Sequence, residues 1–188
     1  MINQKIMEVK DEWYRLLHPK IAFLLVVDKN VMALAWAMPV DDEAKVLAIS
    51  VWKGNYTYEL LEREGEFALC IPSAEMLNQV WFCGTKSGRK TDKIKALNLE
   101  LEKGVKIKTP HLKNCAGFLE CRVIDSISRR EFGEHVIYLA RVVHARANEK
   151  FFHKTWKEGA DILMHVGSAL FTTPSKFLNP RKRRSRKV

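Results

Sequence analysis

Residues 21–51 read IAFLLVVDKNVMALAWAMPVDDEAKVLAISV, and this stretch decides the fold. It holds three apolar runs, which are Ile21 to Val27, Val31 to Met38 and Val46 to Val51. The turn Asp28-Lys29-Asn30 separates the first two, and Pro39 with three acidic residues separates the last two. Runs of this length between turn residues are typical of β-strands joined by tight turns. The pattern therefore predicts antiparallel sheet, without long helices between the strands.

Three more strands are predicted further along the chain, at Phe67 to Ile71, Gly117 to Ser126 and Val136 to Val143. The second of these alternates, with Leu119, Cys121 and Val123 on one face and Glu120 and Arg122 on the other. Alternation of this kind indicates a strand with one face in the core and the other in solvent. Many short strands with few helices predict a mainly β fold that is a closed or partly closed antiparallel barrel.

Helices are predicted at three places. Lys5 to Leu17 carries apolar residues at helical spacing, and His18-Pro19 ends the stripe because a residue before proline avoids the helical region. Tyr58 to Glu64 reads as a second helix, with Thr57 at its N-cap. The third is predicted to reach Phe82, with Ser73 at its N-cap.

Composition indicates one domain of ordinary size. The chain has 188 residues and a net charge of +10, but the tail Arg181 to Val188 holds six of the basic residues, which leaves +4 for the rest. We expect a single domain over 1–180 and a disordered, solvated tail over 181–188. A basic tail can also hold phosphates, so nucleic-acid binding stays open as a less favoured alternative.

The longest apolar run, Ile21 to Val27, is too short for a membrane helix, and we expect a soluble cytoplasmic protein. The four cysteines have no metal-ligand spacing, so no metal site is expected.

Residues 50–57, SVWKGNYT, could bind an anion. A hydroxyl at the end of a strand, a lysine, a glycine and a threonine at a helix start bring together the groups that hold phosphate. The alternative is a capped turn with one solvated lysine. The common phosphate loops G-x-G-x-x-G and G-x-x-x-x-G-K-[ST] are both missing from the sequence.

Residues 84–93, GTKSGRKTDK, form a second donor-rich segment. Trp81-Phe82 precedes it, and Thr91 is predicted to cap the element that follows the segment. Such a loop could wrap a phosphate or an oxygen-rich ring, or it could be a basic surface loop.

Several short motifs, in their order, resemble the flavin-reductase-like, FMN-binding split-barrel family. The motifs are Asn30-Val31-Met32-Ala33, Trp36, Pro39-Val40, Ala48-Ile49-Ser50-Val51, Tyr56-Thr57, Ser87-Gly88-Arg89, Asp92-Lys93, Leu119-Glu120-Cys121, Gly133-Glu134-His135 and His165-Val166-Gly167. The resemblance covers about residues 18 to 173 and looks closest to archaeal flavoproteins of the flavoredoxin or ferric-reductase kind. The family usually has Gly-Asp-His where this chain has Gly133-Glu134-His135.

The resemblance implies an antiparallel split β-barrel of Greek-key type and a homodimer with FMN near the interface. Lys53, Tyr56, Thr57 and Ser50 would lie near the phosphate. Residues Asn30, Ala33, Ala35, Trp36, Val51 and Trp52 would border the ring or the ribityl chain. Ser87 and Gly88 would close over the flavin, and His135 would meet the nicotinamide of NAD(P)H.

The function implied is an FMN-dependent oxidoreductase that passes hydride from NAD(P)H to a flavin, a ferric chelate or a protein acceptor. An FMN-containing electron carrier without NAD(P)H turnover is the alternative. A nucleic-acid-binding barrel comes last, because a stacking platform needs aromatic and basic residues interleaved on one strand.

Overall fold

The computed structural model describes residues 7–174 and 176–178, so the predicted tail at 181–188 lies outside the described residues. Its main feature is a seven-stranded antiparallel sheet with the strand order β3-β2-β6-β9-β10-β5-β4. The strands are β2 (Phe23–Val27), β3 (Asn30–Leu34), β4 (Ala37–Asp41), β5 (Val46–Trp52), β6 (Glu66–Ile71), β9 (Gly117–Ile127) and β10 (His135–Ala147).

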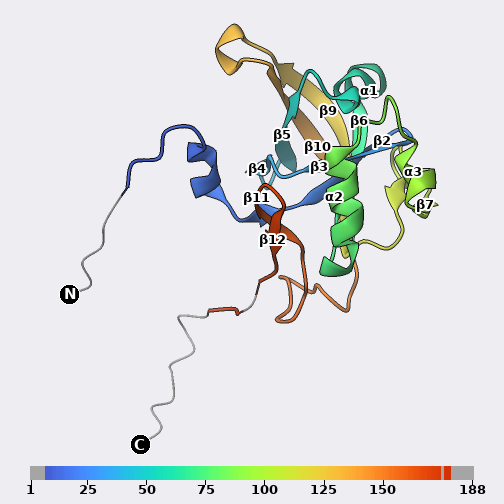
Figure 1. Ribbon diagram of the computed structural model, residues 1–188. Coiled ribbons are helices and arrows are strands. Elements are labelled where there is room, and N and C mark those ends of the chain that lie inside the picture. The colour runs from blue at the N-terminus through green and yellow to red at the C-terminus, as the bar shows by residue number, and fades with distance from the viewer. Residues whose placement is uncertain (1–6, 175, 179–188) are drawn as a thin grey trace, which may run out of the picture.

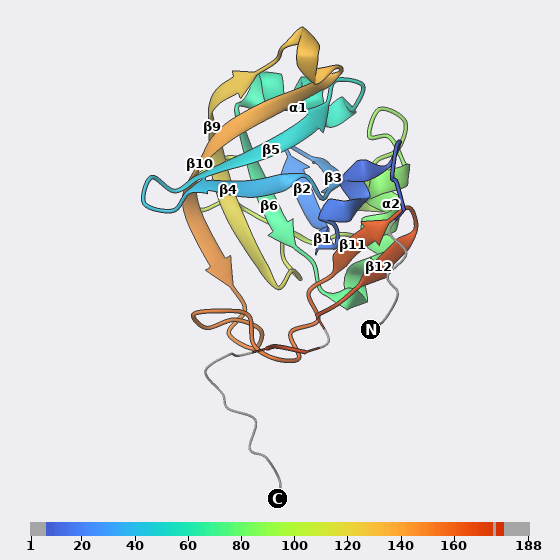
Figure 2. The same ribbon diagram turned by 90° about the vertical axis from the view of Figure 1, so that its left-hand side faces the viewer.

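The sheet curls into a half-barrel (Figure 2). Its two edge strands, β3 and β4, are consecutive in the chain and are joined through Ala35 and Trp36. The Trp36 carbonyl accepts a hydrogen bond of 2.9 Å from the Ser50 N–H, which ties this crossing to β5. The prediction of a mainly β, antiparallel split barrel is confirmed.

Ile21 to Val27 reads as one continuous apolar run because β2 is buried on both faces. Leu25 and Val27 point into the barrel, where they pack with residues such as Phe67 and Tyr138. Leu24 and Val26 point the other way, into a second core under α2 (Leu77–Thr85). A strand that is covered on both faces has no face in solvent, so apolar and polar residues do not alternate along it.

The predicted strand Val31 to Met38 is wrong as one unit, and Pro39 does not end a strand. The chain leaves the sheet at Ala35-Trp36, and β4 then runs through Pro39. Proline is tolerated there because β4 is an edge strand. One side of β4 has no neighbouring strand, so no hydrogen bond of the sheet on that side needs an N–H from Pro39.

Helices cover the curled sheet, and their bounds differ from those predicted. Only η1 (Trp13–Leu17), a short 3-10 helix, forms in the described part of the predicted helix Lys5 to Leu17. The helix α1 (Tyr56–Glu64) has Asn55 at its N-cap, so Thr57 lies inside the helix. A 3-10 turn, η2 (Ala74–Met76), follows Ser73, whose side chain makes no capping hydrogen bond, and then α2 begins. Asp92, and not Thr91, caps α3 (Lys93–Ala96) through a 3.1 Å bond from the Lys95 N–H.

The prediction that Glu120 faces solvent is wrong. Its side chain is fully buried, and its two carboxylate oxygens accept 2.7 Å bonds from the N–H groups of Val105 and Lys106. The loop 103–110 folds over this face of β9, between β7 (Leu101–Glu102) and β8 (His111–Leu112). A buried carboxylate is stable in such a place because it accepts charge-assisted hydrogen bonds.

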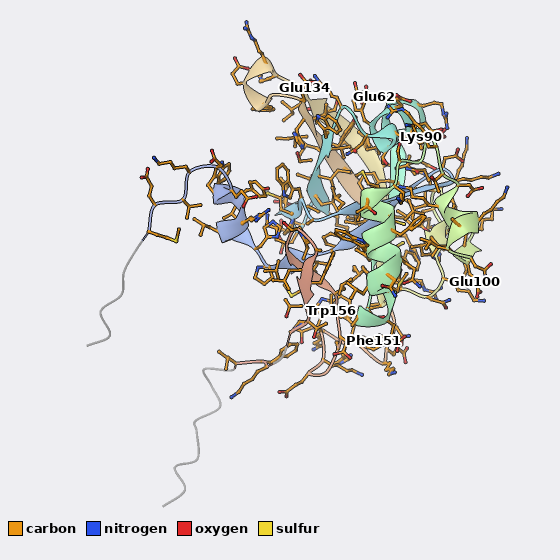
Figure 3. The ribbon with its side chains drawn as sticks, viewed as in Figure 1. Glu62, Lys90, Glu100, Glu134, Phe151 and Trp156 are labelled. Atoms are coloured by element: carbon orange, nitrogen blue, oxygen red, sulfur yellow. The ribbon has the colours of Figure 1, made fainter. Side chains whose placement is uncertain are left out.

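A three-stranded sheet stands beside the half-barrel next to α2 (Figures 1 and 2). It has the order β1-β11-β12 and consists of β1 (Lys20–Ile21), β11 (Met164–Gly167) and β12 (Leu170–Thr172). The loop before it carries Phe151 and Trp156, which lie at the opposite end of the molecule from Glu62 and Lys90 (Figure 3). One further 3-10 turn, η3 (Arg130–Phe132), joins β9 to β10. Within the described residues, the helices all fall short of the length and hydropathy that a membrane crossing requires.

Candidate functional site

A cavity of about 330 Å³ opens where the chain crosses from β3 to β4. We call it the aromatic cavity. Its floor is the segment Met32 to Trp36; the end of β5 adds Ser50 and Trp52, and the turn after β5 adds Asn55. The other walls come from four places in the chain, namely Tyr14 and His18, the helix α2 with Trp81, Gly84 and Thr85, His135 at the start of β10, and His165, Ser168 and Phe171 from the small sheet.

Aromatic rings line the mouth of this cavity. The Trp36 ring lies 5.1 Å from the His135 ring and 5.8 Å from the Tyr14 ring, measured between centroids. Trp52 and Trp81 are each almost half exposed, so they present ring surface to whatever enters. A cavity of this size with aromatic walls and a few polar groups is the usual form of a site for a planar organic cofactor.

The register of the sheet brings His135 to the cavity. It is the first residue of β10 and lies directly opposite Trp52 of β5. A 2.8 Å bond from the Lys53 N–H to the Glu134 carbonyl fixes the turn before it; Figure 3 labels Glu134 at this end of the barrel. The imidazole therefore stands at the rim, against Trp36.

Two further histidines, His18 and His165, belong to the cavity and were not predicted as site residues. His18 Nδ1 lies 3.0 Å from the His165 carbonyl, and His165 Nε2 lies 3.1 Å from the Ser168 carbonyl. A carbonyl oxygen only accepts, so these two ring nitrogens carry the protons. In the neutral rings, His18 Nε2 and His165 Nδ1 are then acceptors, and His18 Nε2 is buried without a partner in the described structure. The pairing of Lys20 with His165 across β1 and β11 creates this group, and no local sequence signal reveals it.

A second hollow, of about 650 Å³, lies beyond the start of β3, and we call it the basic cleft. Asn30, Tyr56 and Gly88 line it. The Asn30 amide donates a 2.9 Å bond to the Thr57 hydroxyl, and Gly88 packs so closely on Asn30 that an added Cβ would lie 2.1 Å from the Asn30 oxygen. Arg89 then ties the loop to α1 through the Gly54 carbonyl and the Glu59 carboxylate.

The predicted site residues thus divide into three groups. Ala33, Ala35, Trp36, Ser50, Trp52 and His135 line the aromatic cavity, and Asn30, Tyr56 and Gly88 line the basic cleft. Val51, Lys53, Thr57 and Ser87 line neither hollow. The Val51 side chain packs inside the barrel, so only its backbone can face a ligand, and the Thr57 hydroxyl is buried against Asn30.

The turn between β5 and α1 still has the features of a phosphate site. The first N–H groups of a helix have no intrahelical partner, and the Asn55 side chain makes no capping hydrogen bond to them. Gly54 allows the Trp52 ring to lie flat on this turn, because a Cβ there would lie 2.3 Å from the indole. Cys83, on the buried face of α2, offers no thiolate, since burial raises its pKa to about 11.

Comparison with known proteins shows the family of this chain. The family model described as "Flavin reductase like domain" matches residues 23–172. The chain belongs to the flavin reductase-like family. An uncharacterised protein of Archaeoglobus fulgidus is 34% identical over 138 residues, which is 72% of this chain and 76% of that protein.

Two solved structures show the same fold. A flavoredoxin from Methanosarcina acetivorans has a TM-score of 0.81 at 23% identity, over 96% of this chain and 97% of that one. An FMN-binding protein from Thermus thermophilus, solved with bound p-hydroxybenzaldehyde, has a TM-score of 0.81 at 18% identity, over 95% and 100% of the two chains.

Proposed function

We propose that this protein binds FMN in the aromatic cavity and is a flavin-dependent oxidoreductase with NAD(P)H as its hydride donor. The observation that carries the proposal is the cavity at the β3–β4 crossing, in a chain of the flavin reductase-like family. The FMN-binding neighbour of the same fold supports the choice of cofactor.

The residues of the cavity fit a flavin. The segment Ala33 to Trp36 lines the cavity where β3 forms an edge of the sheet, and the Trp36 and Trp52 rings offer apolar contact area. His18 Nε2, buried and unpartnered, is an acceptor that an N–H group of a bound ring would satisfy. The open N-terminus of α1 suits a terminal phosphate.

Bound FMN would supply the hydride and electron transfer, and the chain's own residues would bind, orient and shield it. Gly84 and Thr85 at the end of α2 and the crossing at Trp36 would both contact the ring. His135 at the rim would hydrogen-bond the carboxamide or a phosphate of NAD(P)H. This bond would hold the nicotinamide next to the flavin ring. No side-chain acid or base is required in this assignment.

We expect the purified protein to be yellow and to release FMN rather than FAD. The spectrum is recorded before and after heat release, and the stripped protein is titrated with FMN, FAD and riboflavin. FMN should bind at least ten-fold more tightly than riboflavin, since a charge-assisted bond to phosphate contributes about 1.5–3 kcal/mol. A colourless protein that takes up no added FMN would contradict the proposal.

We also propose that the protein is a homodimer. Trp13, Leu17, Met38 and Val40 are each at least half exposed, and Trp13, Leu17 and Met38 line one apolar hollow of about 240 Å³. Tyr14, His18, Trp36 and Ser50 belong both to this hollow and to the aromatic cavity. A second copy seated here would cover exposed apolar surface and close the cavity at the same time.

The Met38→Glu variant tests the dimer. We expect the parent to have the mass of two chains in light scattering after size exclusion, and the variant to be monomeric and to bind FMN more weakly. Ile124→Glu is the matched control, because Ile124 is also about half exposed but lies on β9, outside this hollow. A monomeric parent, or a dimeric Met38→Glu variant, would contradict the assignment.

A further inference from the structure

Three sulfur-containing side chains meet in the second core, on the face of the sheet that α2 covers. They are Cys70 of β6, Met76 at the end of η2 and Cys115 in the turn before β9. The Cys115 thiol lies 3.9 Å from the Met76 sulfur, and it also interacts with the Cys70 thiol. We call these three residues the sulfur cluster.

Strand pairing brings the two cysteines of the cluster together. β6 and β9 are antiparallel neighbours, and Cys70 lies opposite Phe118. The Ala116 N–H donates a 2.9 Å bond to the Ile71 carbonyl, so the turn that carries Cys115 is held beside β6. The spacing of cysteines along the chain does not reveal such a contact.

The separation of the sulfur atoms fits a metal ion with three sulfur ligands. Zinc–sulfur bonds in proteins are about 2.3 Å long, and three sulfur atoms at that distance around one ion stand about 4.0 Å apart when all four atoms are coplanar. The 3.9 Å between Cys115 and Met76 is close to this value. These two side chains can therefore share one ion without a large movement.

A backbone N–H group points at one of the sulfur atoms. The Leu112 N–H lies 3.4 Å from Cys70 Sγ. A neutral thiol is a weak acceptor, whereas a metal-bound thiolate is a charged acceptor that such a donor stabilises. Buried cysteines most often serve as small apolar core residues, and Cys121 in the barrel core is of that kind. Cys70 differs because it has both a second thiol beside it and a donor aimed at its sulfur.

Cys115 gives the cluster a route to solvent. Cys70 and Met76 are buried, whereas Cys115 is partly exposed and shares its turn with the exposed Lys113. Lys113 pairs with Glu100, which Figure 3 labels, so the entry lies on that side of the molecule. The three sulfur residues line neither the aromatic cavity nor the basic cleft, so an ion bound here would not compete with a flavin.

The types of ligand select a soft monovalent cation. Thiolate and thioether sulfur suit Cu(I), whereas structural zinc sites use four ligands drawn from cysteine, histidine and carboxylate side chains. Among residues 7–174 and 176–178, no group of three His, Cys, Asp or Glu side chains is placed to hold a metal ion. The cluster has two cysteines, and its third ligand is the thioether of Met76, which favours a soft ion.

We propose that the sulfur cluster binds one Cu(I) ion through Cys70, Met76 and Cys115. The ion replaces the two thiol protons, which pass to solvent, and the copper stays in the +1 state, so the step needs no oxidant or reductant. Bound copper would join β6, η2 and the turn before β9. The inference goes beyond the proposed function and holds whether or not the protein binds FMN.

The test is anaerobic competition for copper between the reduced protein and the coloured Cu(I) complex of bicinchoninate. We expect the parent to take up one Cu(I) per chain. Cys115→Ser and Met76→Leu should each bind it at least about ten-fold more weakly, because even a residue that only orients a metal ligand contributes about 10–100-fold to affinity. Excess Zn(II) should not displace the ion. Cys121→Ala is the matched control, since it removes a buried thiol outside the cluster and should bind copper like the parent.

Four results would overturn the proposal. The first two are no uptake by the parent, and equal affinity in the parent and in either cluster variant. The third is loss of uptake in Cys121→Ala, which would mean that the copper binds another thiol. The fourth comes from titrating thiols with DTNB in denaturant: four free thiols per chain are expected, and two fewer would mean that a Cys70–Cys115 disulfide takes the place of the metal site.

X-ray absorption at the copper edge identifies the ligands directly. We expect three sulfur neighbours at about 2.3 Å and no nitrogen or oxygen neighbour. A nitrogen neighbour would assign the copper to a histidine and would also overturn the proposal. Should Cys115→Ser fail to fold, Met76→Leu carries the competition test alone, because this exchange nearly conserves side-chain volume.

Discussion

A Glu120→Ala variant is expected to lose about 3–5 kcal/mol of its free energy of unfolding. The parent carboxylate is fully buried and accepts two 2.7 Å bonds, from the N–H groups of Val105 and Lys106. Removing it leaves two backbone donors without a partner beside an empty space, and hydrogen bonds to a charged acceptor are the stronger kind. The measurement is urea denaturation followed by tryptophan fluorescence.

Two further variants isolate the cause. Glu120→Gln keeps the size of the side chain and one acceptor oxygen, so it should lose roughly half as much stability. Glu66 accepts from the Lys108 and Thr109 N–H groups in the same loop, but it is only half-buried, and Glu66→Gln should lose less than Glu120→Gln. If Glu120→Ala unfolds at the same urea concentration as the parent, the loop 103–110 is not held by this carboxylate.

Glu120 also marks a limit of what the sequence could predict. Alternation along Gly117 to Ser126 correctly predicts a strand, but it assigns Glu120 to solvent because it considers one strand alone. The covering loop comes from residues 103–110, which carry no regular pattern that shows where they pack. Pro39 was misjudged for the same reason, because the sequence of one strand does not show its neighbours. Proline usually ends a strand, and only the strand order shows that β4 is an edge strand, in which proline is tolerated.

Part of the functional site could likewise be predicted from the sequence, and part of it could not. His135 and Trp52 could be predicted to meet once β5 and β10 are paired, and the paired register places them opposite each other. His18 and His165 come together only through the two-residue strand β1, which is too short to give a periodic signal. On its sequence alone the loop 84–93 favours a basic surface loop over a phosphate loop, and only the structure shows that Gly84 and Thr85 line the aromatic cavity and Gly88 the basic cleft. Patterns in the sequence thus located the segments, and tertiary packing decided which atoms are left without partners.

Replacing His135 is expected to slow reduction of the flavin by NAD(P)H without removing the flavin. In His135→Ala, bound FMN should stay nearly unchanged, because the imidazole stands at the rim against Trp36 and not on the floor of the cavity. Loss of one hydrogen bond to the dinucleotide should raise the half-saturating NAD(P)H concentration by roughly ten-fold. Anaerobic stopped-flow bleaching of the flavin over a range of NADH and NADPH concentrations measures both the rate and the half-saturation.

His135→Phe is the variant that separates hydrogen bonding from packing. A phenyl ring keeps the contact with Trp36, whose centroid lies 5.1 Å from that of the imidazole, but it has no nitrogen to donate or accept. If His135 binds the dinucleotide, Phe and Ala should be equally impaired; if it only supports Trp36, Phe should restore the rate. Equal rates and equal half-saturation in the parent and both variants would exclude His135 from the site. A parent that NAD(P)H does not reduce would instead favour the electron-carrier alternative, in which another protein delivers the electrons.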